Sequence, residues 1–98
     1  MEKFINKKVI VRGDRSGVFF GTLKEKEGTE VILENCRRLW YWSGAASISQ
    51  IAVDGVTNPS GCRFTVTVDE IGITDAIEII PCTDKAIRII EGVGEWKM

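Results

Sequence analysis

The first 42 residues carry three strand-like segments rich in β-branched and aromatic residues, separated by two short turns that contain glycine. The segments span residues 7–12, 18–26 and 30–42. Short segments of this composition bounded by turns are typical of strands, with Val9 and Val11 on one face of the first and Ile10 on the other, and tight turns between such strands favour antiparallel pairing. This part of the chain therefore predicts a three-stranded antiparallel sheet.

Two positions inside these segments predict departures from a flat sheet. Gly21 lies in the middle of the second segment, where a glycine marks a strong bend or a close approach of two backbones. The alternation of the third segment is imperfect around Asn35 and Cys36, which predicts a β-bulge there.

The period of the apolar residues changes after the third segment. Within residues 44–54 they recur at spacings of three and four, which predicts an amphipathic helix that starts near Gly44. Ser47 followed by Gln50 matches a capping box, and Gly55 suits the residue after the helix. Residues 56–61 have the composition of a loop.

The rest of the chain predicts two further strands and a short helix. Residues 62–68 alternate cleanly, Asp69 and Glu70 are interpreted as a turn, and residues 71–81 form a fifth strand that Pro81 stops. Thr83 is placed to cap a helix over residues 84–91.

The predicted fold class is mainly β with minor α, in one domain that spans residues 1–98. We expect a small five-stranded antiparallel barrel or a strongly bent sheet, with one helix after the third strand and a short C-terminal helix. Open strand edges and three tryptophans in a chain of 98 residues predict a homo-oligomer.

The charge and composition argue against several classes of function. The chain has 13 basic and 14 acidic side chains, so neither bulk nucleic-acid binding nor attraction to an anionic membrane is expected. It has no apolar run long enough to cross a bilayer and its start lacks a signal-peptide core, which favours a cytoplasmic location. We expect neither a metal nor a cofactor, because histidine is absent and the three cysteines have no zinc-like spacing. The cysteines are interpreted as small buried hydrophobic residues.

The strongest candidate site is the stretch over residues 37–47, which holds the only Arg-Arg pair, the only tyrosine and two tryptophans. Arginine binds phosphate through paired hydrogen bonds, aromatic faces stack on bases, and a helix start favours an anion. The candidate ligand-binding residues are Arg37, Arg38, Trp40, Trp42, Ser43, Gly44 and Ser47. In the competing interpretation, the tryptophans fill a core or an oligomer interface, as large aromatics often do, and the arginines pair with acids such as Glu34.

The acidic residues offer a weaker candidate. Asp69, Glu70, Asp75 and Glu78 are close in sequence, and paired carboxylates can act as acid and base or bind a divalent ion. Their spacing fits a turn and a strand, so a solvated face is the favoured interpretation.

Two resemblances extend this picture. Residues 9–33, with a glycine turn, a strand with an internal glycine and a charged hairpin, resemble Sm-like and SH3-like small barrels. The chain also resembles, over nearly its full length, small phage and prophage proteins of uncharacterised function. The residues that carry this resemblance are the run 37–45, followed by Ser49-Gln50 and Gly55-Val56. That resemblance implies a phage-derived accessory protein in the host cytoplasm, a class that includes counter-defence proteins.

Three functions follow as hypotheses. The first is a counter-defence binding protein that sequesters a small anionic ligand, a nucleotide-type signal. The second is an inhibitor or assembly protein that binds a host protein through the Trp-rich strand. The third, and least favoured, is a small phosphodiesterase-like or glycosidase-like enzyme that uses Asp69, Glu70 or Glu78.

Overall fold

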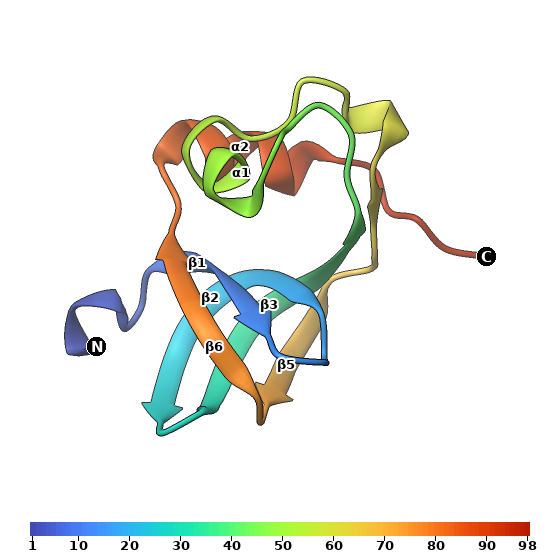
Figure 1. Ribbon diagram of the computed structural model, residues 1–98. Helices are drawn as coiled ribbons and strands as arrows, with labels where there is room; N and C mark the ends of the chain where they lie inside the picture. The colour runs from blue at the N-terminus through green and yellow to red at the C-terminus, as the bar shows by residue number, and fades with distance from the viewer.

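The computed structural model describes residues 1–98 and shows one antiparallel sheet with two helices packed over it (Figure 1). The strands are β1 (Lys8–Gly13), β2 (Val18–Glu27), β3 (Glu30–Tyr41), β4 (Arg63–Phe64), β5 (Val68–Ile73) and β6 (Ala76–Pro81). The helices are α1 (Ile48–Asp54) and α2 (Asp84–Gly92), with short 3-10 turns η1 (Glu2–Phe4) and η2 (Pro59–Gly61). Neither helix combines the length and apolar character needed to cross a membrane.

The sheet is strongly bent and remains open. Its strand order is β4-β3-β2-β1-β6, and β5 pairs with β3 on the side away from β2. β5 and β6 follow each other in sequence but do not pair, so the sheet does not close into a barrel. The tip of the β2–β3 hairpin bridges part of the opening, because Thr29 Oγ1 donates to the Thr74 carbonyl and the Ala76 amide donates to the Thr29 carbonyl. The predicted mainly β, antiparallel fold is confirmed in its bent-sheet form.

The strand boundaries in the second half differ from the prediction, and the sheet has six strands instead of five. β4 is only two residues long, and Asp69 and Glu70 lie within β5, so their interpretation as a turn is wrong. The cause lies at Thr65, whose amide donates to the Arg38 carbonyl while its hydroxyl accepts from the Arg38 amide. The chain then moves along β3 to pair with residues 31–36.

The first helix starts later than predicted. α1 begins at Ile48, and Gly44 lies in the preceding loop with a φ of 90°. Ser47 caps the helix as predicted, with its hydroxyl accepting from the Gln50 amide. The reciprocal half of the capping box is absent, because the Gln50 side chain accepts from Ala46 instead of Ser47.

Both predicted irregularities of the sheet are confirmed. Asn35 has a φ of 49°, and the β2–β3 register shifts by one residue between Glu34 and Arg37. At Gly21, an added Cβ would lie 3.0 Å from the Glu34 carbonyl oxygen and 3.1 Å from Cys36 Cβ. The glycine therefore lets β2 and β3 approach closely at the bulge.

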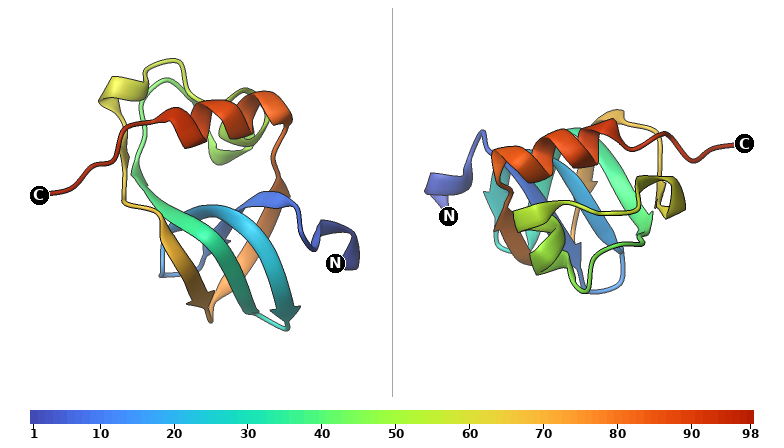
Figure 2. Two further views of the ribbon diagram at one scale, coloured as in Figure 1. Left: turned by 180° about the vertical axis from the view of Figure 1, so that it is seen from behind. Right: turned by 90° about the horizontal axis from the view of Figure 1, so that it is seen from above.

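The alternation of the strands produces two hydrophobic cores. Val9 and Val11 face the core inside the curve of the sheet, whereas Ile10 faces the core under the helices. The inner core consists of Val9, Val11, Phe19, Leu23, Val31, Leu33, Cys36, Ile73 and Ala76. The core under the helices consists of Ile10, Phe20, Leu39, Ile51, Ala52, Val56, Cys62, Phe64, Ala86, Ile90 and Val93. Figure 2 shows α1 and α2 side by side over one face of the sheet.

Candidate functional site

Arg37 is buried, and its donors bind backbone carbonyls of the protein. Its side chain is only 4% exposed and points toward the helices. Nη1 donates to the carbonyls of Ile90 (3.0 Å) and Val93 (2.9 Å), at the C-terminal end of α2. Nη2 donates to the carbonyl of Phe64, and Nε to that of Thr65. Burial lowers the pKa of this guanidinium, and Glu95 acts in the opposite direction. The cation therefore satisfies the open end of a helix and ties α2 to β4.

Arg38 points to the other face and is exposed. Its Nη1 donates to the Ser16 carbonyl at 2.9 Å, and its guanidinium carbon lies 4.6 Å from the centre of the Phe19 ring. It forms no ion pair with an acidic side chain. Arg38 therefore retains donors and a full charge for an external group.

Three of the predicted site residues come together in one hollow of about 290 Å³. Arg38, Trp40 and Trp42 line it, opposite residues 16–18. Trp40 is 54% exposed, whereas Trp42 is half-buried against the core under the helices. The volume is just below the range of about 300–1,000 Å³ that is typical of small-molecule sites.

The other predicted residues hold the loop around α1. The Ser43 hydroxyl accepts from the Asn58 side chain, and the Gly44 carbonyl accepts from both the amide and the hydroxyl of Thr57. Ser47 caps α1. None of these three residues lines the hollow; they stabilise the loop and the helix start that follow β3.

An exposed group of side chains lies beside the hollow, and we call it the aromatic face: Trp40, Tyr41, Arg63 and Trp96. The rings of Trp40 and Trp96 are stacked, with centroids 4.9 Å apart and an interplanar angle of 27°. The Arg63 guanidinium carbon lies 5.6 Å from the Trp40 ring centre, 5.9 Å from Tyr41 and 5.5 Å from Trp96. Such separations allow cation–π attraction.

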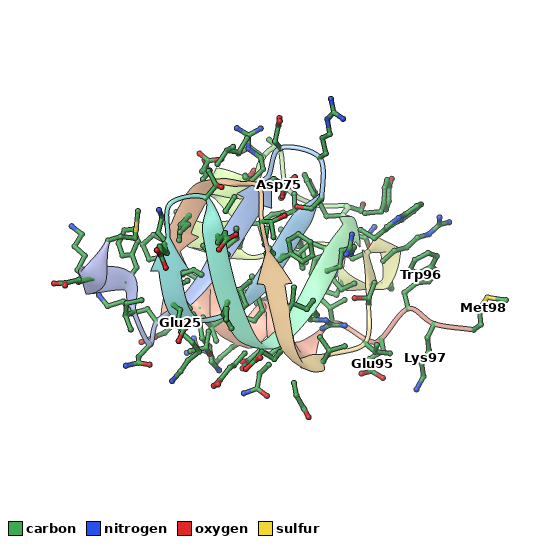
Figure 3. The ribbon with its side chains drawn as sticks, turned by 90° about the horizontal axis from the view of Figure 1, so that it is seen from below. Glu25, Asp75, Glu95, Trp96, Lys97 and Met98 are labelled. Atoms are coloured by element: carbon green, nitrogen blue, oxygen red, sulfur yellow. The ribbon has the colours of Figure 1, made fainter.

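Backbone pairing builds the aromatic face from three segments. Arg63 of β4 pairs with Tyr41 of β3, and the Trp96 amide donates to the Phe64 carbonyl at 2.8 Å. Figure 3 shows Trp96 on the extended C-terminal tail. Sequence reasoning missed Arg63 and Trp96, because one resembles the polar side of any half-buried strand and the other lies in a short tail.

A larger hollow of about 350 Å³ lies on the other side of Arg38. Arg15, Arg38 and residues 71–75 contribute to its wall. The Asp75 carboxylate accepts from the Ser16 hydroxyl (2.5 Å) and from the amides of Arg15 (2.8 Å) and Ser16 (3.0 Å). The Ser16 hydroxyl and then the Arg15 amide are the main causes that lower the pKa of Asp75. This carboxylate therefore holds the turn whose Ser16 carbonyl accepts from Arg38.

The comparisons with known proteins give a family and no activity. Residues 6–90 match the family model described as Domain of unknown function (DUF6948). The chain belongs to this family. No curated protein matches the chain significantly. The matched part of the DUF6948 domain includes Arg38, Trp40 and Arg63, whereas Trp96 lies beyond it.

The acidic side chains of this DUF6948 domain do not converge on one point. Asp69 and Glu70 are exposed on β5, Asp75 binds the turn near Ser16, and Glu78 pairs with Arg12 at 3.0 Å. The structure holds no group of three side chains suited to bind a metal ion.

The three cysteines are free thiols. Cys36 and Cys62 are buried, and Cys82 is partly buried. Burial raises the pKa of both Cys36 and Cys82 to about 12. These two thiols are protonated at neutral pH and are therefore poor nucleophiles.

Proposed function

We propose that this DUF6948 domain is a binding protein that captures a small anionic ligand of nucleotide type in the hollow of Arg38, Trp40 and Trp42. One observation carries the proposal. Arg38, which forms no ion pair, lines the same hollow as the indole rings of Trp40 and Trp42. The guanidinium suits a phosphate group, and the indole rings suit a base. Arg37 is not part of this proposal, because its donors are engaged inside the protein.

We also propose a biological setting. The similarity to small phage and prophage proteins supports a phage-encoded counter-defence role in the host cytoplasm. A protein that binds a nucleotide signal without converting it lowers the free concentration of that signal. This role requires tight binding and no catalytic group.

The test is a thermal-shift screen with mononucleotides, dinucleotides and cyclic nucleotides. A ligand at 100 times its Kd adds about 2.7 kcal/mol of stability, which raises the Tm of a domain this small by on the order of 10 °C. The Arg38→Gln variant should remain folded and lose the shift. The Arg88→Gln variant, which removes an exposed arginine from α2, should keep it. Absence of any shift at saturating ligand would refute the proposal.

A protein partner is the second candidate, and the aromatic face favours it. Trp, Tyr and Arg are the residue types that dominate binding energy at protein interfaces, and here they are clustered and exposed. In a pull-down from host lysate, the wild type should retain a defined partner that the Trp40→Ala, Trp96→Ala double variant, which removes the exposed stacked rings, loses.

We further propose that the protein forms homo-oligomers. β5 and β6 each pair along only one side, so both have an edge that can accept another strand. Ile77 of β6 is 51% exposed and adds apolar surface at one of these edges.

A further inference from the structure

We infer that the ligand is a single-stranded oligonucleotide segment of two or three nucleotides, which lies across β3 from the Arg38 hollow to the aromatic face. The inference rests on the proposed function and names its ligand class more closely. Two features carry it: the binding surface is continuous, and each of its two parts holds an arginine without an ion pair, Arg38 in the hollow and Arg63 in the aromatic face.

The surface is continuous because Trp40 belongs to both parts. It lines the hollow with Arg38 and Trp42, and it stacks on Trp96 in the aromatic face. A third shallow hollow, of about 320 Å³, is formed by Trp40, Tyr41 and Trp42 alone. Aromatic side chains therefore occupy the whole distance between the two ends.

The backbone positions of the two arginines suggest the length of the ligand. Arg38 and Tyr41 are three residues apart on β3, a backbone separation of at most about 10 Å at ~3.3 Å per residue, because the strand is irregular between Leu39 and Tyr41. Arg63 pairs directly with Tyr41 from β4. Successive nucleotides of a stacked strand rise by about 3.4 Å, so this distance matches about three of them. A nucleoside monophosphate has one phosphate group, whereas a segment of two or three nucleotides can place a phosphate at each of the two arginines.

The charges on this surface favour an anionic polymer. Arg38 and Arg63 form no ion pairs, in contrast to Arg12, which pairs with Glu78. Glu95, the only acidic residue of the C-terminal tail over residues 93–98, pairs with Lys97 at 3.4 Å (Figure 3). Cations interleaved with aromatic rings are typical of proteins that bind single strands by stacking. An acidic peptide would satisfy the arginines but would leave the ring faces without stacking partners.

The test is a length series of oligodeoxythymidylates from one to six nucleotides, with binding followed by tryptophan fluorescence. Affinity should rise up to about three nucleotides and then level off, because only two phosphates meet arginines. Two neutralised phosphates predict a slope of log K against log salt of about −1.4. The Arg63→Gln variant should bind the trinucleotide about tenfold more weakly, with a slope near −0.7, and should bind the mononucleotide as the wild type does. Arg88→Gln is the matched control and should change neither value.

The outcomes separate this inference from the proposed function. If mononucleotide and trinucleotide bind equally and Arg63→Gln has no effect, the oligonucleotide is excluded and the mononucleotide site remains. If neither binds, the inference fails, and the proposed function fails as well only when the thermal-shift screen with dinucleotides and cyclic nucleotides also gives no shift. If a hexaglutamate peptide or an abasic trinucleotide binds as tightly as the thymidylate, stacking is absent and the inference is overturned.

Discussion

Arg37 and Arg38 are neighbours on β3 with opposite environments. Arg37 is buried and donates to carbonyls from β4 and from the end of α2, whereas Arg38 is exposed and donates one bond to the Ser16 carbonyl. Since adjacent side chains of a strand point to opposite faces, one face supplies a structural cation and the other a free one. Two identical side chains, one residue apart, therefore differ in role: Arg37 stabilises the fold, and Arg38 is exposed to solvent.

We expect Arg37→Met to lower the free energy of unfolding by about 3 kcal/mol. Buried carbonyls that lose their donor cost ~1–3 kcal/mol each, and methionine keeps most of the apolar contacts. Urea denaturation followed by circular dichroism measures the change. Arg38→Met is the matched control and should stay within about 1 kcal/mol of the wild type. Equal effects of the two variants would contradict the structural assignment of Arg37.

Asp75 predicts a specific pH dependence of stability. Its pKa is lowered in the folded protein, so its contribution is present above the pKa of the unfolded chain, about 3.9, and is lost as the pH falls through the folded-state pKa. The Asp75→Asn variant should have a lower Tm at pH 7, and the difference from the wild type should shrink in acid. Thermal melts between about pH 7 and pH 2 test this. Asp69→Asn, which alters an exposed carboxylate on β5, should give a smaller difference at pH 7.

The two helices depend on a glycine at their contact. Gly55 ends α1 with a φ of 74° and a ψ of −148°, and an added Cβ would lie 2.8 Å from Ile89 Cβ on α2. This backbone conformation is essentially restricted to glycine. The element pair α1–α2 therefore covers the sheet only if residue 55 has no side chain.

Gly55→Ala should lower the free energy of unfolding by about 2–3 kcal/mol, from backbone strain and the contact with Ile89. Gly92→Ala is the control, because Gly92 lies in α2, has a negative φ and has no atom within 4 Å of an added Cβ. It should be neutral or stabilising by up to ~1 kcal/mol. Chemical denaturation of the two variants measures both free energies of unfolding. If Gly55→Ala is as stable as the wild type, the result would argue against the packing of α1 on α2.

Local sequence patterns predict the strands and helices of this fold better than the contacts that these elements make with distant parts of the chain. The alternation of Val9, Ile10 and Val11 predicts a strand with two apolar faces, and the structure has a core on each side of it. Gly21 predicts a close approach, since only glycine tolerates one there. The break at Thr65 is not predictable from its neighbours, because it depends on a hydrogen bond to Arg38, 27 residues away.

The same limit applies to the candidate site. The Trp-rich strand predicts an arginine and two tryptophans in one hollow, because they lie close together on β3. The burial of Arg37 depends on a helix end more than 50 residues later in the chain. Trp96 reaches the aromatic face only because the tail pairs with Phe64. Contacts of this kind arise from tertiary structure and leave no local pattern.

At the scale of the whole molecule, the sheet is curved but unclosed. The tie between Thr29 and Thr74 holds the hairpin tip to the β5–β6 turn, while the outer edges of β5 and β6 remain without strand partners. Open edges attract further strands unless charge or another chain covers them.

We therefore expect the wild type to form a dimer or a larger homo-oligomer in native mass spectrometry at micromolar concentration. Ile77→Lys places a charge on β6, at an exposed apolar position, and should shift the population toward monomer. Val53→Lys, at an exposed apolar position on α1, should leave the population unchanged. A wild type that is monomeric at every concentration would contradict the expectation.

The two ends of the chain lie at opposite ends of the molecule (Figure 1). The last residues run past the aromatic face, where Trp96 is stacked on Trp40. Any polypeptide joined after Met98 would start two residues from that stack, beside the surface on which ligand binding is proposed. Affinity tags and fluorescent fusions therefore belong before Met1, at the end of the molecule far from this surface.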